Sequence, residues 1–158
     1  MGKHSPTRRT TYFTTHARYL EQLTASGIVT GDNLTTQNIG YGCLQMLGRL
    51  RIRNRLILTV NKILKPIEQE NVISVQSIRY AYNLSFEEGG NIFRYDNAHP
   101  HTHLGHTTAF HIHRYDLLTK KEIIGSPFEI SDLENWPTLG EVIQEADNLY
   151  WQIIEKEL

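Results

Sequence analysis

The chain has 158 residues, of which 39% are hydrophobic and 21% charged, and its formal net charge is −1 with the histidines neutral. This length suits one compact domain, and the near-neutral charge provides no general attraction to a polyanion, so affinity for nucleic acid has to come from local patches. No apolar run can span a bilayer, and the N-terminus lacks the apolar core of a signal peptide. The single cysteine, Cys43, excludes an internal disulfide and a cysteine-based zinc site. We therefore expect a soluble, cytoplasmic protein with no membrane partner.

The N-terminal quarter is predicted to be a helix followed by a loop. Between Tyr12 and Ala25 apolar residues recur at helical spacing, and Gly27 is expected to end the helix. The stretch from Gly31 to Gly42 is rich in glycine, asparagine and threonine, which is typical of a hinge loop. We therefore divide the chain into an N-terminal extension with an amphipathic helix, residues 1–36, and a single α+β domain, residues 37–158.

From Arg49 onward the hydrophobic period changes to two, as in strands. Residues 49–53 and 56–65 are expected to pair as a hairpin. The outer side of the first strand would carry a row of arginines: Arg49, Arg51 and Arg53. That row is either a charged surface facing solvent or a strip that contacts phosphates through its guanidinium groups. The strand from Val72 to Phe86, with Ile78 and Tyr80 on one face, should form a hairpin with the strand that contains Arg94.

The last elements are predicted to be two strands and a helix. A strand at residues 107–115 should be followed by a turn at Asp116 and a returning strand from Leu117 to Gly125. Thr138 and Glu141 have the spacing of a capping box, and an apolar helical stripe follows them. The expected fold class is α+β: an antiparallel sheet of about five or six strands, with an N-terminal helix and with a C-terminal helix packed on one face. The other face would gather the charged residues of the strands: Arg79, Arg94, Asp96, His111 and His113.

Six of the eight histidines lie between Arg94 and Arg114. Imidazole donates and accepts protons near neutral pH because its unperturbed pKa is about 6.5. His111 and His113 are two positions apart, so they share one face of the predicted strand and can act as an acid and a base. We expect both rings to point outward, in which case His111→Ala would leave the fold intact.

The charged face meets the needs of RNA cleavage by internal transesterification, which requires no metal. One imidazole takes the proton of the 2′-hydroxyl, the other protonates the leaving 5′-oxygen, and Arg94 and Arg79 stabilise the phosphorane. Asp96 would orient a histidine or pair with Arg94. The residues therefore favour an acid–base nuclease with His111, His113, Arg94, Asp96 and Arg79 in its active site.

Two other kinds of site stay open. In the first, His111 and His113 bind a divalent metal ion together with loop histidines (His99, His101, His103 or His106), and the ion activates water. The scarcity of carboxylates in this stretch disfavours a hard ion. In the second, the protein is a non-catalytic module that binds nucleic acid or protein. Its contacts would come from the loop and the arginines: His99, His101, His103, Arg49, Arg51, Arg53 and Arg114. Apart from such a metal ion, no cofactor is expected.

The run IRYAYN, a turn with GGN and the block IFRYDNAHPH resemble the TumE-like family, the toxins of bacterial type II toxin–antitoxin pairs. The matching positions are Tyr80, Tyr82, Gly90, Asn91, Arg94, Tyr95, Asp96, Asn97, Ala98 and His99. The resemblance implies a toxin that a cognate antitoxin holds inactive and whose activity is ribonucleolytic, with RNA as substrate. Residues and resemblance together predict a toxin component that is a metal-independent endoribonuclease. A homo-oligomer stays open.

Overall fold

The computed structural model describes residues 2–97, 110–125, 128–129 and 135–157. Within these ranges the chain forms two helices and nine strands, and all nine strands belong to one sheet. The elements in chain order are β1 (Thr7–Arg8), α1 (Arg9–Ala25), β2 (Val29–Asp32), β3 (Thr35–Gly40), β4 (Cys43–Ile52), β5 (Leu56–Gln69), β6 (Val72–Phe86), β7 (Asn91–Asp96), β8 (His111–Arg114), β9 (Phe128–Glu129) and α2 (Leu139–Glu157). The predicted α+β class is confirmed; short strands beyond the expected five or six enlarge the sheet.

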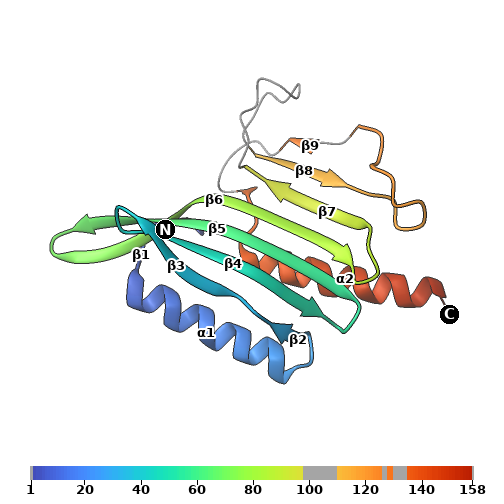
Figure 1. The fold of residues 1–158 in the computed structure, drawn as a ribbon, viewed down its shortest axis with the longest axis horizontal. Coiled ribbons are helices and arrows are strands. Elements are labelled where there is room, and N and C mark those ends of the chain that lie inside the picture. The colour runs from blue at the N-terminus through green and yellow to red at the C-terminus, as the bar shows by residue number, and fades with distance from the viewer. Residues whose placement is uncertain (1, 98–109, 126–127, 130–134, 158) are drawn as a thin grey trace.

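The sheet is antiparallel throughout, in the order β2-β4-β5-β6-β7-β8-β9, with β3 also paired to β4 and β1 to β6 (Figure 1). Two long hairpins form its centre. β4 and β5 are joined by the three residues 53–55, and β5 and β6 by the two residues Glu70 and Asn71; Arg53, Asn54, Glu70 and Asn71 all have positive φ, as tight hairpin turns require. The antiparallel pairing of β4 with β5 and of β6 with β7 confirms the two hairpins predicted from the sequence.

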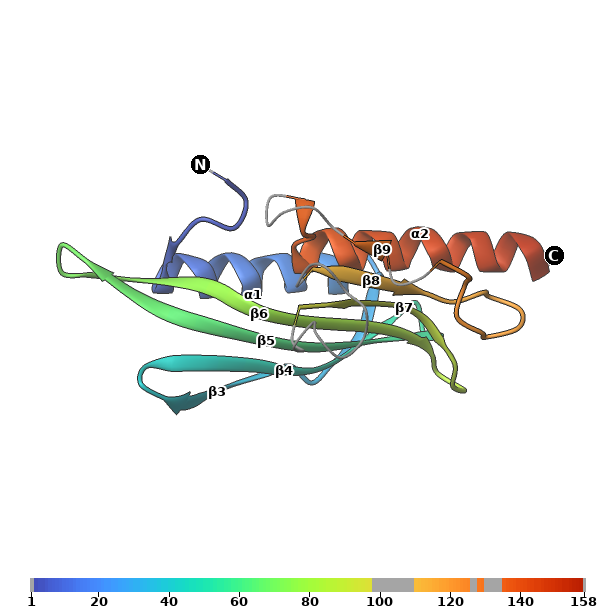
Figure 2. The same cartoon turned by 90° about the horizontal axis from the view of Figure 1, so that it is seen from above.

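Both helices lie on the same side of the sheet, as Figure 2 shows. The face beneath them is apolar, because alternate residues of each strand point to it: Leu58, Tyr82 and Tyr95 are among its buried residues. The indole of Trp136, just before α2, is fully buried and lies against the rings of Tyr80, Tyr95 and Phe110 at centroid distances of 5.9, 5.7 and 5.3 Å. None of the described helices covers the opposite face, which we call the open face.

The predicted hinge loop at Gly31 to Gly42 is wrong, because this stretch contains β2 and β3, which both pair with β4. All six residues of β3 are exposed, so the strand is held by backbone pairing and carries no apolar alternation that a sequence pattern can register. Leu23 in α1 and Val29 in β2 belong to the main core. The first 36 residues thus contribute packing to the same sheet as the rest of the chain.

The predicted returning strand from Leu117 to Gly125 is also wrong. The carboxylate of Asp116 accepts backbone N–H groups of Leu118 and Thr119 at 3.0 and 2.7 Å, which folds the chain into a local turn. Within the described residues, only an isolated bridge joins Tyr115 to Glu122, and β8 pairs instead with β9. The apolar residues that suggested a strand are exposed, Leu118 at 87% and Ile124 at 99%.

Helix α2 begins with the predicted capping box. The backbone N–H of Glu141 donates to the hydroxyl of Thr138 at 3.3 Å, and the N–H of Thr138 donates to the carboxylate of Glu141 at 2.7 Å. Its buried stripe is Leu139, Val142, Ile143, Ala146, Asp147 and Ile153. No helix in the described ranges is long and apolar enough to cross a membrane.

Candidate active site on the open face

Polar side chains form a row across the open face. Successive strand pairings connect one residue each from β4 to β8: Arg49, Thr59, Asn83, Arg94 and His113. Adjacent strands lie about 4.8 Å apart, so this row extends over about 19 Å. A second row, through Asn61, Ala81, Asp96 and His111, runs beside it. Both rows cross β7 and end on β8, the strand that carries His111 and His113.

Four residues on these two strands, Arg94, Asp96, His111 and His113, make up what we call the β7–β8 quartet. The pairing of the two strands sets Arg94 opposite His113 and Asp96 opposite His111. The guanidinium of Arg94 donates to the Asp96 carboxylate, and the two imidazole rings meet edge to face with centroids 5.1 Å apart. Strand alternation predicted that these four side chains share a face, and the pairing brings them together.

The quartet is not uniformly exposed. The side chain of Arg94 is 43% exposed and that of His113 is 17% exposed, whereas Asp96 and His111 are fully buried. The expectation that His111 points outward and adds little packing is therefore wrong. Its strand is an inner one, because β9 pairs with β8 directly at His111. Within the quartet, Arg94 and His113 are the residues that reach solvent.

A carboxylate outside the quartet holds His113. The Nδ1 atom of His113 lies 2.6 Å from a carboxylate oxygen of Glu122. A carboxylate at this nitrogen keeps it as a donor and leaves Nε2 as the basic nitrogen of the neutral ring. Sequence reasoning missed Glu122, because it assigned the residue to a strand. The contact depends on the Asp116 turn, and the one available signal was the short distance between the two residues in the sequence.

Arg79 lies beside the quartet on the open face. It is exposed and sits two positions along β6 from Ala81, the residue paired with Asp96. Diagonal neighbours of this kind lie about 7–8 Å apart, within reach of a long side chain. Arg94 is paired with Asn83, four positions along β6 from Arg79, so the two predicted phosphate-binding arginines share the open face but start about 13 Å apart along the strands. His99, His101, His103 and His106 lie outside the described residues.

Comparison with known proteins identifies the chain's relatives. The model of the toxin TumE family matches residues 16–147, which is most of the chain. The chain belongs to the TumE toxin family. The match begins within α1 and ends within α2, so the quartet lies inside it. Comparison with curated proteins and with solved structures gave no significant match. The resemblance to TumE-like toxins is confirmed, and membership in a toxin family implies a cognate antitoxin as partner.

The arginines predicted for binding divide between the two faces of this TumE-family fold. Arg49 and Arg51 are on the open face, where Arg51 pairs with Glu87 at 2.6 Å. Arg53 does not continue the row, because the positive φ of the turn directs its side chain to Asp147 of α2 at 2.7 Å. A cation–π contact with Trp151 at 5.2 Å also holds it there.

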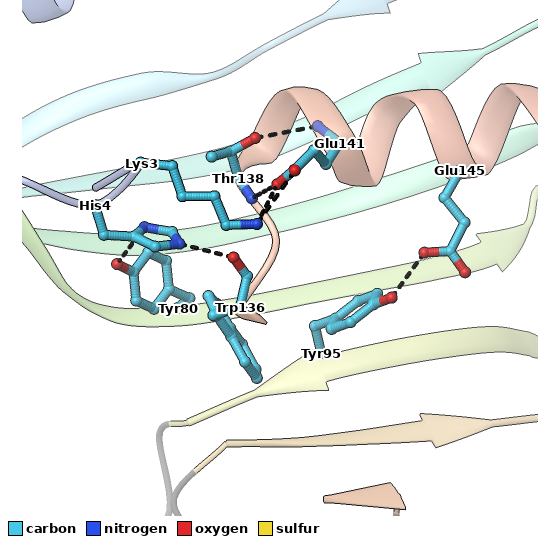
Figure 3. A network of polar contacts seen from close by, with 8 residues as sticks. All are labelled: Lys3, His4, Tyr80, Tyr95, Trp136, Thr138, Glu141 and Glu145. Carbon is cyan, nitrogen blue, oxygen red and sulfur yellow. Dashed lines mark hydrogen bonds and ion pairs between the residues drawn. The ribbon is translucent and has the colours of Figure 1, made fainter. Parts of the chain in front are cut away.

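Arg114 likewise lies under α2, where its guanidinium donates to Glu145 at 2.7 Å. The hydroxyl of Tyr95 donates to the same carboxylate at 2.8 Å (Figure 3). Burial and the nearby Glu145 charge raise the pKa of Tyr95, so this phenol stays protonated and remains a donor. The structure thus places Arg53 and Arg114 where they attach α2, away from the open face.

The metal-site alternative for this TumE-family toxin depends on the loop histidines. Among the residues that the structure describes, no group of three or more histidine, cysteine, aspartate or glutamate side chains is arranged to hold a metal ion. A site built on His111 and His113 would take its further ligands from His99, His101, His103 or His106, which are outside those ranges. Two adjacent imidazoles with an arginine beside them are the kinds of group that metal-free acid–base chemistry at a phosphate uses.

Proposed function

We propose that this toxin is a metal-independent endoribonuclease of the cytoplasm whose active site is the β7–β8 quartet with Glu122 and Arg79. One observation carries the proposal: Arg94, a partly exposed cation, sits directly opposite His113, a histidine held by a carboxylate. Side chains at paired positions on adjacent strands are about 5 Å apart, so a phosphate held by Arg94 would lie within reach of the imidazole.

The reaction is internal transesterification. A neutral imidazole removes the proton of the 2′-hydroxyl, the 2′-oxygen attacks phosphorus, and the bond to the 5′-oxygen breaks as an imidazolium protonates that oxygen. The products are a 2′,3′-cyclic phosphate and a free 5′-hydroxyl. Arg94 and Arg79 would stabilise the negative charge of the phosphorane, and Asp96 would hold Arg94 in place through their ion pair.

His113 is the residue of the acid–base pair that would contact RNA, because part of its side chain is exposed. His111 supplies the second imidazole from a buried position, with its ring centroid 5.1 Å from that of His113. Its participation requires that RNA binding opens the site around it. The row that ends at Arg49 would contact the backbone of a single strand, since guanidinium groups grip phosphate oxygens.

The test is incubation of the purified toxin with mixed-sequence single-stranded RNA, with and without EDTA, followed by analysis of the product ends. Cleavage that survives EDTA and leaves 2′,3′-cyclic phosphates is expected. Cleavage that EDTA abolishes would assign the histidines to a metal site. RNA binding without cleavage in either tube would make the non-catalytic module the correct function.

Two variants assign the residues. His113→Ala and Arg94→Ala should each lower the cleavage rate at least about 100-fold, the usual contribution of a proton-transfer group or of a charge aimed at the transition state. The matched control is Arg18→Ala, which removes an exposed arginine of α1 on the other side of the sheet and should leave the rate unchanged. Parental cleavage by His113→Ala would refute this active site. Circular dichroism of each variant checks that the fold is kept.

A further inference from the structure

A cavity lies on the helix side of the sheet. It has a volume of about 340 Å³, and its walls come from the segment before α1, from α1, β5 and β6, and from the start of α2. Seven of its fourteen described lining residues carry a hydroxyl group and four are lysine or histidine, whereas none is aspartate or glutamate. The cavity thus offers hydrogen-bond donors and positive charge without a negative group of its own.

Lys62 is the most unusual residue of this cavity. It lies on β5 between Met46 and Tyr80, on the covered face, and is only 8% exposed. Its ammonium lies 5.2 Å from the ring centroid of Tyr12 and 5.7 Å from that of Tyr80. No described residue accepts a hydrogen bond from it or forms an ion pair with it. A buried ammonium is costly unless an anion compensates it, and aromatic faces supply only part of that compensation.

The other basic groups of the cavity are differently placed. Nε2 of His4 lies 2.7 Å from the backbone oxygen of Trp136, and its Nδ1 lies 3.3 Å from the Tyr80 hydroxyl (Figure 3). The ammonium of Lys3 donates to Glu141 at 3.0 Å, also visible in Figure 3. These contacts fix both residues at the α2 end of the cavity. Lys62 therefore remains as the buried positive charge without a carboxylate.

The electrostatics agree with this geometry. Burial lowers the pKa of the Lys62 ammonium to about 8, so the group is still mostly protonated at neutral pH. The pKa of the His16 imidazole on the neighbouring wall is lowered, mainly by burial and to a smaller extent by the positive charge of Lys62. The negative charge of Asp32 acts in the opposite direction. A negative ligand would relieve both unfavourable effects.

We propose that this cavity is a binding site for a small phosphate monoester, whose phosphate oxygens accept hydrogen bonds from the Lys62 ammonium and from nearby hydroxyls such as Thr15 and Ser77. Phosphate provides several acceptor oxygens, which suits a wall rich in hydroxyl donors. The volume exceeds the need of a bare oxyanion and falls at the lower end of the range of about 300–1,000 Å³ for small-molecule sites. This site is separate from the quartet, which is on the opposite face, and does not depend on ribonuclease activity.

The binding test uses inorganic phosphate and adenosine monophosphate as probes, at ionic strength matched with chloride. Isothermal titration should detect both, and the unfolding temperature should rise with probe concentration, as for any ligand of the native state. Lys62→Met, which keeps the side-chain volume, should weaken binding at least about tenfold. Lys65→Met, at an exposed position of the same strand, should not change it.

A second variant guards against a change of the core. Thr15 is an exposed residue of α1 on the wall of the cavity, so Thr15→Glu introduces a negative charge without altering packing. Phosphate binding should be lost, and the unfolding temperature without ligand should not fall, because the new carboxylate can compensate the Lys62 ammonium. The proposal fails if wild type shows no phosphate-specific response, if Lys62→Met responds as wild type does, or if acetate at equal ionic strength has the same effect as phosphate.

A further experiment asks whether the bound phosphate belongs to a nucleic-acid strand or to a free small molecule. DNA oligonucleotides lack the 2′-hydroxyl needed for transesterification, so they report binding alone. One outcome is that a strand with a 5′-phosphate binds more tightly than the same strand with a 5′-hydroxyl, and that Lys62→Met removes the difference. That result would support the proposed site and would identify its ligand as the phosphorylated end of a strand. Equal binding of the two strands, with adenosine monophosphate still bound, supports it with a free phosphate compound as its ligand.

Discussion

The two faces of the sheet use arginine in opposite ways. On the helix side, Arg53, Arg55 and Arg114 each pair with a carboxylate of α2, at 2.7, 2.6 and 2.7 Å. On the open face, Arg94 pairs with a carboxylate of its own strand and Arg49 forms no ion pair with any described residue. Arginines that are neighbours in the sequence therefore differ in their contacts: Arg53 and Arg55 join the β4–β5 turn to α2, whereas Arg51 pairs with Glu87 on the open face and Arg49 has no ion pair with any described residue.

Removal of the residue at the centre of the covered face should have the largest effect. Trp136→Ala deletes a fully buried indole that lies against three aromatic rings, and should lower the free energy of unfolding by about 3–5 kcal/mol. Chemical denaturation monitored by circular dichroism measures the loss. Leu118→Ala, at an 87% exposed position, is the control and should change stability by less than about 0.5 kcal/mol. A small loss for Trp136→Ala would mean that α2 is not firmly packed on the sheet.

The buried ammonium on the covered face should make stability depend on pH. Since the pKa of Lys62 falls from 10.5 when unfolded to about 8 when folded, the unfolded chain binds more protons between these values, and stability should rise with pH across that window. The full penalty, about 3 kcal/mol, applies below pH 8. Above pH 10 the trend reverses, because burial raises the pKa values of Tyr12 and Tyr80 to about 12.

Lys62→Met should therefore stabilise the protein at pH 7 and abolish the rise between pH 8 and 10. Denaturation midpoints of both proteins, measured at half-unit steps of pH without phosphate, provide the comparison. Parallel curves for the two proteins would show that the lysine is not desolvated in the folded state.

Replacing one arginine on each face tests directly whether the arginines of the two faces have different roles. Arg53→Met leaves the Asp147 carboxylate, whose side chain is 9% exposed, without its cation, and should cost about 2 kcal/mol of stability with no change in RNA affinity. Arg49→Met should change stability by less than about 0.5 kcal/mol, but should weaken RNA binding and lower its salt dependence by about one counterion. Filter binding at several salt concentrations, together with urea denaturation, separates the two effects. If the two variants exchange phenotypes, the assignment of the faces is wrong.

The smallest effect is expected at the carboxylate behind His113. Glu122→Gln keeps an acceptor for Nδ1 but removes the charge that stabilises an imidazolium, so the cleavage rate should fall about tenfold, equivalent to about 1.4 kcal/mol. Glu155→Gln, at an exposed position of α2, is the matched control. Single-turnover cleavage under conditions of saturating enzyme is the measurement. A role for Glu122 in substrate binding alone would change the affinity and leave this rate as it is.

The elements that the sequence predicted well are those whose apolar residues recur regularly along one face. Strand β6 and helix α2 carry long apolar stripes, and both were located closely. Ile78 was predicted to lie inward with Tyr80, but a register shift between Ile63 and Leu64 of β5 turns it outward, and it is 48% exposed. Alternation cannot anticipate such a bulge, because Ile78 is an extra residue in β6 that interrupts the period of two.

The candidate site was predictable only in part, for the same reason. Alternation along β7 and β8 was sufficient to gather the quartet on one face. The full burial of His111 is a property of the folded chain, and the contact of Glu122 with His113 depends on the turn at Asp116, so neither follows from a local pattern. Lys62 was missed although the signal existed: it lies two residues after Val60, in the same inward register.

The ion pairs of α2 also determine the order in which the molecule can be completed. Arg53 and Asp147 are 94 positions apart in the sequence, and Arg55 and Glu157 are 102 apart. During synthesis, the hairpins β4–β5 and β6–β7 are available to form long before the residues that cover their apolar face exist. Until α2 leaves the ribosome, Tyr82 and its neighbours have no cover from it, so the nascent chain exposes apolar surface of the kind that chaperones recognise.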